Sequence, residues 1–201
     1  TAELAKLTEN SYRDVNIAFA NELSMICDSE GINVWELVRL ANRHPRVNIL
    51  NPGPGVGGHC IAVDPWFIVA RAGEAARLIR TAREVTEAKP GWVSDKVRRS
   101  ADKFKHPVIA CLGLAFKADV DDLRESPAVE IVRQLVSDGI GDILVSEPNL
   151  ASHDEFELRS CDEIIEAADI ILLLVDHRQY RNLKAADLKE KVLIDTRGLV
   201  T

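Results

Sequence analysis

Cys60 is the residue with the clearest chemical potential, because it ends the run Asn51-Pro-Gly-Pro-Gly-Val-Gly-Gly-His-Cys60. Glycine and proline at this density exclude regular structure and predict a loop that approaches a ligand closely. An accessible thiol at the end of such a loop is a candidate nucleophile, and the adjacent His59 is a candidate for lowering its pKa. The alternatives are an ordinary tight turn and an unreactive cysteine. Cys27, Cys111 and Cys161 lie on apolar helix or strand positions and are interpreted as small buried hydrophobes.

Lys6 and Asn10 form a second polar pair, near the start of the chain. Four residues apart on a predicted helix, they share one face. A cation and an amide that face a thiol would stabilise the oxyanion formed when the thiol attacks a carbonyl group. A solvated helix face is the alternative.

The glycine run also matches G-x-G-x-x-G through Gly53, Gly55 and Gly58. The dinucleotide fingerprint requires an apolar strand before the glycines and a helix after them within a βαβ unit. Residues 48–52 make a poor strand and helical patterns flank the loop, so we assign no NAD site here. Gly55, Gly57 and Gly58 remain candidates for close backbone contact with a substrate.

The first half of the chain has helical spacing of apolar residues. It predicts helices from Ala2 to about Arg43, interrupted at Gly31, with Asn33 as N-cap of the second helix. Another helix follows Asp64-Pro65, and Pro90 predicts a break before a helix that ends near Lys103.

The second half alternates strands with helices. Ser126 is the predicted N-cap of a helix with Pro127 at its first position. The alternation predicts a parallel sheet, hence an α/β fold: an all-helical dimerisation segment over residues 1–88, then a small Rossmann-like domain over 89–201. The expected strands are 108–112, 143–145, 170–175 and 192–194, and the expected helices are 127–138, 161–168 and 183–189.

Composition narrows the class of partner. The 201 residues include 25 Lys and Arg against 32 Asp and Glu, which gives a net charge of −7 spread along the chain. This charge argues against binding to nucleic acid or to anionic membranes. There is no long apolar run and no signal peptide, so we expect a soluble, cytoplasmic protein with a small-molecule ligand. The four cysteines are far apart, without metal-ligand spacing, and predict free thiols.

The ends of the predicted strands supply further candidates, because open parallel sheets bind ligands at their carboxyl edge. Phe116 and Lys117 follow the first strand, and Arg197 follows the last. The forked guanidinium of Arg197 suits a phosphate group; the alternative is an arginine with no ligand at the protein surface. For Phe116 the alternative is an aromatic side chain that only packs on the sheet. Arg124 is expected to order the first loop by pairing with Asp121 or Asp122.

Several of these motifs, in order and in register over nearly the whole chain, resemble the UDP-glucose/GDP-mannose dehydrogenase family. Family members have an N-terminal NAD-binding Rossmann domain, a central helical dimerisation region and a C-terminal domain that holds the UDP-sugar. The resemblance therefore implies a homodimer through the N-terminal helices, and a C-terminal fragment, beginning at Thr1, that lacks the cofactor domain and is inactive alone. The stretches that carry it are Ala2-Glu-Leu-Ala-Lys-Leu-Thr-Glu-Asn10, Gly53-Pro-Gly-Val-Gly-Gly-His-Cys-Ile-Ala-Val-Asp-Pro65, Gly113-Leu-Ala-Phe-Lys117 and Asp121-Asp-Leu-Arg-Glu-Ser-Pro127.

The resemblance also implies roles for individual residues. The family oxidises the C6 alcohol of a nucleotide sugar to a carboxylate with two NAD+. Cys60 would trap the aldehyde as a thiohemiacetal and later carry a thioester that water hydrolyses. Lys6 would stabilise oxyanions or shuttle a proton, while Asn10 and Asp64 would position the water.

The remaining implied roles concern the substrate. Arg46, or Arg43 in an alternative alignment, would reach the sugar bound to the partner subunit; either could instead be a helix-end cation. Phe116 would stack on the uridine, and Lys117 and Arg197 would contact the nucleotide. The glycine run favours UDP-N-acetylmannosamine, with UDP-N-acetylglucosamine and UDP-glucose as alternatives. Two other classes stay open: a non-catalytic dimerisation or nucleotide-binding module, and a cofactor-free thiol hydrolase, for which no His/Asp pairing is evident.

Overall fold

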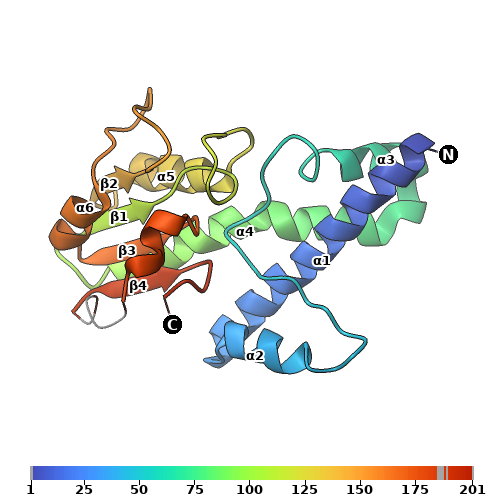
Figure 1. The fold of residues 1–201 in the computed structure, drawn as a ribbon, viewed down its shortest axis with the longest axis horizontal. Coiled ribbons are helices and arrows are strands. Elements are labelled where there is room, and N and C mark those ends of the chain that lie inside the picture. The colour runs from blue at the N-terminus through green and yellow to red at the C-terminus, as the bar shows by residue number, and fades with distance from the viewer. Residues whose placement is uncertain (1, 185–187, 189, 201) are drawn as a thin grey trace. The chain divides into compact units, whose positions relative to one another are not determined.

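The computed structural model describes residues 2–184, 188 and 190–200. The chain divides into two compact units, Thr1–Lys89 and Pro90–Thr201 (Figure 1). Among the described residues, no helix combines the length and the apolar character that crossing a bilayer requires.

The first unit is helical, as predicted. Gly31, with φ of +68°, follows the last residue of α1, and the Asn33 side chain caps α2 by accepting the backbone N–H of Trp35 at 2.9 Å. The unit contains α1 (Ala2–Glu30), α2 (Val34–Ala41), α3 (Asp64–Ala72), the short 3-10 helix η1 (Gly73–Ala76) and the first part of α4 (Arg77–Ala101).

The predicted break at Pro90 is wrong, because α4 continues through this residue. A proline inside a helix costs about 3 kcal/mol through a lost hydrogen bond and a clash with the preceding turn. Here the helix is held on both sides of the proline. The Lys89 amine donates to the Ser24 hydroxyl of α1 at 2.7 Å, while Val93 and Val97 are fully buried in the core of the second unit. Tertiary packing thus outweighs the local signal.

The second unit is built on a parallel sheet, which confirms the predicted α/β class. The strand order is β2-β1-β3-β4, and Leu112 pairs with both Ser146 and Leu173, which in turn pairs with Asp195. The carboxyl ends of the strands therefore lie level along one edge. The strands are β1 (Val108–Leu112), β2 (Asp142–Ser146), β3 (Ile170–Leu173) and β4 (Val192–Asp195), and the helices are α5 (Pro127–Asp138), α6 (Cys161–Ala167) and the 3-10 helix η2 (Arg178–Asn182) (Figure 1).

Two local details differ from expectation. Ser126 is the N-cap residue of α5, but its hydroxyl donates to the Leu114 carbonyl at 2.6 Å and makes no capping bond. The strand predicted to reach 175 ends at Leu173, because the next two N–H groups both turn back to the Leu112 carbonyl.

Only part of the helix predicted near the C-terminus lies within the described residues. Of the predicted helix 183–189, residues 185–187 and 189 lie outside the described residues. The short helix η2 was not predicted; it buries Tyr180, whose hydroxyl donates to the Ser146 carbonyl at 2.9 Å.

Candidate active site

Cys60 lies in the turn that leads into α3, where its side chain is half-buried. The buried Gly58 allows the chain to turn just before Cys60, because its φ of +82° is a backbone conformation that residues other than glycine rarely adopt. The Cys60 carbonyl accepts the backbone N–H groups of Val63 and Asp64 at 3.1 and 2.8 Å. The thiol-bearing residue is thus tied to the first turn of α3.

Two asparagines that sequence reasoning missed hold the loop before Cys60. Asn21, fully buried on α1, accepts the Gly53 N–H at 2.8 Å. The Asn42 side chain bonds both backbone groups of Ile49, at 2.7 and 2.9 Å. Neither asparagine belongs to a motif, and the residue types alone did not reveal which backbone groups the two amides would bind.

Asn10 and Asp64 meet although they are far apart in the sequence. The buried Asn10 amide donates from Nδ2 to Asp64 Oδ2 at 2.5 Å. This bond joins α1 to the start of α3, so that both residues belong to one cluster with the turn of Cys60.

Lys6 lies one helical turn before Asn10 on α1, and its amine contacts Glu9 at 3.3 Å. Both side chains of this ion pair are well exposed, and such pairs contribute at most about 1 kcal/mol. The amine is therefore readily available to another anion. His59 is exposed.

The other cysteines occupy different environments. Cys27 and Cys111 are buried and Cys161 is half-buried. Burial raises the pKa of the Cys111 thiol to about 12. Burial, reinforced by the adjacent Asp162, raises that of Cys161 to about 11. A thiol with a raised pKa is a poor nucleophile at neutral pH, and the buried Cys27 is not accessible to a substrate, so Cys60 is the stronger candidate.

A buried ion pair supports α3 from α1 and α4. Arg83 Nη1 lies 2.8 Å from Asp14 Oδ1, and both side chains are almost completely buried. Arg83 also contacts Glu87 at 3.2 Å, and the Glu87 carboxylate accepts the indole N–H of Trp66, in the first turn of α3, at 2.9 Å. Burial raises the pKa of Asp14, although the Arg83 charge opposes this shift.

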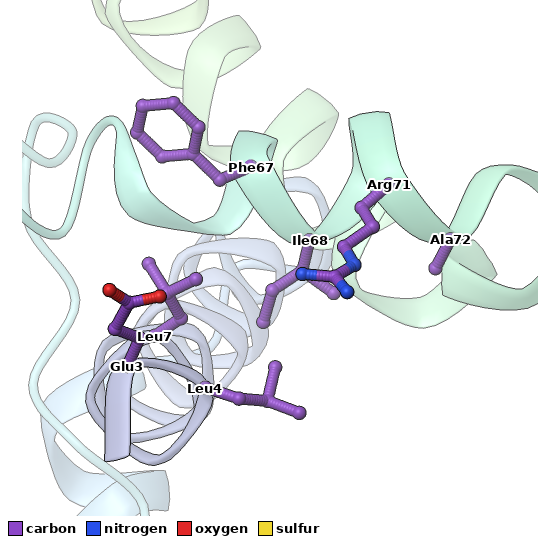
Figure 2. A pocket seen from close by; sticks show the side chains of 7 residues that line it. All are labelled: Glu3, Leu4, Leu7, Phe67, Ile68, Arg71 and Ala72. Carbon is purple, nitrogen blue, oxygen red and sulfur yellow. The ribbon is translucent and has the colours of Figure 1, made fainter. Parts of the chain in front are cut away.

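Helices α1 and α3 also line an open groove of about 500 Å³. Figure 2 shows Leu4 and Leu7 of α1 and Ile68 of α3, with the charged Glu3 beside Leu7 and the charged Arg71 beside Ile68. The mostly apolar lining suits hydrophobic contacts better than a phosphate.

The carboxyl edge of the sheet carries the second set of candidates. Phe116 is half-buried in the loop after β1, and the exposed Lys117 amine lies 5.3 Å from the centre of its ring. The Phe116 N–H donates to the Asp122 carbonyl at 3.1 Å, and the Arg124 Nε donates to the Asp122 carboxylate at 3.0 Å. The predicted pairing of Arg124 is therefore confirmed, with Asp122 as its partner.

Arg197 also lies at this edge, after β4. Its Nε donates to Asp176 Oδ1 at 2.7 Å, and its backbone N–H donates to Asp195 at 2.8 Å. The guanidinium thus has an anionic partner that a bound phosphate would have to displace or share.

The arginine candidates of the first unit are exposed. Arg43 and Arg46 both follow α2, and the Arg46 N–H donates to the His44 ring at 3.2 Å.

Two buried residues at the sheet edge were missed by sequence reasoning. Glu147 follows β2 and His177 lies shortly after β3, and His177 Nε2 lies 3.0 Å from Glu147 Oε2. Burial opposes ionisation of Glu147, but hydrogen bonds from His177 and from the N–H groups of Leu114 and Asn149 hold its pKa below the ordinary value. The only sequence signal was their position after predicted buried strands.

The glycine loop before Cys60 does not fit a dinucleotide site. The Gly53–Gly58 segment follows irregular chain rather than a strand, and residues 59–63 form turns before α3 begins. The βαβ context that the fingerprint needs is absent around these glycines, so no described residue is assigned to NAD.

The class of protein follows from comparison with solved structures. The chain superposes on the UDP-N-acetyl-mannosamine dehydrogenase of Staphylococcus aureus with a TM-score of 0.88 and 43% identity, covering 100% of this chain and 48% of that one. A UDP-D-ManNAc dehydrogenase from Pyrococcus horikoshii gives a TM-score of 0.87 and 36% identity, with 100% and 49% covered. The fold is thus that of about half of a sugar-nucleotide dehydrogenase chain.

Family models give the particular assignment. The central-domain model of the UDP-glucose/GDP-mannose dehydrogenase family matches residues 1–88, and the UDP-binding-domain model of the same family matches residues 110–201. The chain belongs to the UDP-glucose/GDP-mannose dehydrogenase family, as its motifs predicted.

Curated relatives agree with this assignment. An NDP-N-acetyl-D-galactosaminuronic acid dehydrogenase of Ralstonia solanacearum is 63% identical over 203 residues, covering 99% of this chain and 48% of the relative. The UDP-N-acetyl-D-mannosamine dehydrogenase of Escherichia coli K12 is 54% identical over 212 residues, covering 99% and 50%. The chain spans about half the length of the curated relatives it matches.

Proposed function

We propose that this chain is part of a nucleotide-sugar 6-dehydrogenase that converts UDP-N-acetyl-D-mannosamine to UDP-N-acetyl-D-mannosaminuronate with two NAD+. The hydrogen bond between Asn10 and Asp64 carries the proposal, because it joins the amide and carboxylate of two helices beside the turn of Cys60. Family membership and the printed names of the mannosamine dehydrogenases support the substrate class. A nucleotide-linked N-acetylgalactosamine sugar is the second candidate, favoured by the relative at 63% identity.

In this proposal Cys60 is the nucleophile. Its sulfur forms a bond to the C6 aldehyde carbon, and the carbonyl oxygen takes up a proton to give a thiohemiacetal. The Lys6 amine stabilises the negative oxygen during attack, after leaving its weak pair with Glu9. When bound, NAD+ would supply the oxidising power as the acceptor of two hydrides, the first from the C6 alcohol and the second from the thiohemiacetal carbon, which becomes the thioester carbon.

Asp64 and Asn10 act on the hydrolytic step. The Asn10 amide donates to Oδ2 of Asp64 and orients the carboxylate. Oδ1 can then accept a hydrogen bond from a water molecule that attacks the thioester carbon, releasing the carboxylate product and the Cys60 thiol. Gly55, Gly57 and Gly58 let the backbone approach the sugar, and Arg46 is a candidate contact for the partner's sugar.

In the second unit, Phe116 stacks on the uracil, while Lys117 and Arg197 pair with the diphosphate. The amine beside the aromatic ring and the arginine at the same sheet edge supply one stacking surface and two cations. A parallel sheet presents its ligand site at this edge.

The first unit is also proposed to form a homodimer with a second copy of the chain. Tyr12, Phe19 and Ile26 are 70%, 50% and 52% exposed and recur every seven residues along α1. Such a stripe of apolar side chains is typical of a helix that packs on a partner helix. Sedimentation should show a dimer for the native chain and a monomer for Phe19→Glu; an unchanged sedimentation coefficient in the variant would contradict this surface.

The catalytic proposal is tested in a full-length enzyme that contains this chain. Cys60→Ala should lower kcat by about a thousandfold or more, since without the nucleophile neither the thiohemiacetal nor the thioester can form. Cys161→Ala is the matched control, because that cysteine is also half-buried, and it should retain activity. If Cys60→Ala is active, the thiol is incidental. The relative kcat/KM values for UDP-N-acetylmannosamine and UDP-N-acetylgalactosamine separate the two substrate candidates.

The nucleotide proposal is tested with the chain itself. Calorimetric titration should show binding of UDP and of UDP-N-acetylmannosamine, weakened in Lys117→Ala. Equal binding in this variant, or no binding to the native chain, would remove the proposed nucleotide site. The chain alone should not reduce NAD+.

A further inference from the structure

We infer that Glu147 and His177 are positioning residues that hold the loop after β1 in its nucleotide-binding shape. The inference rests on the nucleotide role proposed for Phe116 and Lys117 in that loop. Both Glu147 and His177 have fully buried side chains, and neither has a role in the proposed chemistry.

Glu147 holds the start of the loop. Its Oε2 accepts the backbone N–H groups of Leu114 and Ala115 at 2.7 and 3.0 Å, and its Oε1 accepts that of Asn149 at 3.0 Å. Hydrogen bonds to a charged acceptor are stronger than those between neutral groups. The last residue before Phe116 is thus anchored to the end of β2.

His177 holds the far end of the loop. Its Nδ1 accepts the backbone N–H of Asp119 at 2.9 Å. A backbone N–H can only donate, so Nδ1 must carry the lone pair and Nε2 the proton. Nε2 then donates to Glu147 Oε2 at 3.0 Å, which couples the two anchors. The Asn149 amide, 2.9 Å from Nδ1, donates to the same acceptor.

Asp119 has a conformation that needs such support. Its φ is +61°, in the left-handed region that residues other than glycine seldom adopt, and its carboxylate accepts the Arg178 N–H at 2.9 Å. Strained backbone persists where surrounding contacts determine it. Phe116 and Lys117 lie between the two anchors at Ala115 and Asp119, so the anchors fix where the ring and the amine stand.

The test compares Glu147→Gln with Asp169→Asn. In Glu147→Gln one carboxylate oxygen becomes an NH2 group, which faces backbone N–H donors that it cannot accept. The loop should therefore be released. Asp169 is the matched control, because its carboxylate accepts the N–H of Val108, the first residue of β1, at 2.9 Å, at the opposite end of the strand from the loop. In calorimetry, Glu147→Gln should weaken UDP binding about tenfold or more, whereas Asp169→Asn should bind UDP as the native chain does.

Replacement of His177 provides a rescue experiment. His177→Phe removes both ring contacts, whereas His177→Asn can keep an acceptor near the position of Nδ1. UDP affinity should therefore be closer to native in His177→Asn than in His177→Phe. Equal affinity in the two variants would contradict the assigned role of Nδ1.

Amide hydrogen exchange separates this inference from the nucleotide proposal. In Glu147→Gln, exchange should accelerate at Leu114, Ala115 and Asp119 while the strand amides keep their protection, with or without UDP. If the strands lose protection equally, the two residues only stabilise the domain and the inference is overturned; native UDP affinity in Glu147→Gln would also overturn it. If the native chain does not bind UDP while Glu147→Gln still exchanges faster at these loop amides, the nucleotide role alone is contradicted.

Discussion

The buried pair of Asp14 and Arg83 leads to a quantitative prediction for Asp14→Ala. The two side chains are 0% and 3% exposed, so the variant leaves a guanidinium charge in the interior. Removing one partner of a buried pair costs about 3–5 kcal/mol. Glu87 still contacts Arg83, but it is 51% exposed and offsets only part of this cost. We expect a loss of about 3 kcal/mol in the free energy of unfolding.

A double variant tests the reasoning behind this magnitude. In Asp14→Leu/Arg83→Met both charges are replaced by apolar side chains, a change that is often neutral or stabilising. Here Asp14 Oδ2 and Arg83 Nε are buried without a hydrogen-bond partner, so the native pair is imperfectly satisfied. The double variant should therefore be within about 1 kcal/mol of the native chain, or more stable.

Urea unfolding followed by tryptophan fluorescence measures both variants. Trp66 is a suitable reporter because its indole N–H binds Glu87, the second partner of Arg83. A loss below about 1 kcal/mol in Asp14→Ala would refute the assumption that the guanidinium stays buried and unpaired. A double variant as unstable as the single one would show that packing, not charge, controls the site.

The pH dependence of the same pair has a defined sign. Burial raises the pKa of Asp14 above its ordinary value, so between the unfolded and folded pKa values the folded state binds more protons than the unfolded state. The stability contribution of Asp14 must then fall as the pH rises through this window. The native chain, measured relative to Asp14→Asn, should lose stability from acidic toward neutral pH. A difference that rises over this window would contradict the direction of the shift.

Two further predictions concern other positions. Iodoacetamide at pH 8 should modify Cys60 before Cys111, whose burial raises its pKa to about 12, and mass spectrometry of the folded chain would contradict this if both react equally. Gly113→Ala should lower Tm more than Gly139→Ala: both glycines have positive φ, but only at Gly113 would the new Cβ lie 2.5 Å from Val175 Cβ, and equal shifts in Tm would argue against that clash.

The elements that sequence patterns predicted well are those whose cause is local. Gly31 and Asn33 end and begin helices through their own backbone preference and side chain. Buried strands of the second unit are recognisable because both of their faces are apolar. The family motifs likewise lie in contiguous stretches, so the family and the candidate residues were accessible without coordinates.

Elements that depend on distant neighbours were not predictable in this way. Pro90 indicates a helix break in isolation, but α4 is held on both sides of it by groups from distant parts of the chain. The contact between Asn10 and Asp64 joins residues 54 positions apart, and spacing along one helix could not reveal it.

Side-chain pairing at the sheet edge belongs to the same category. Glu147 and His177 follow different strands, and only the register of β1, β2 and β3 brings them behind one loop. Residue types and spacing along the chain suffice for helices, strands and motifs, because those depend on neighbours within a few positions. Which buried donor meets which acceptor depends on how distant segments pack, and that is decided only when the whole chain folds.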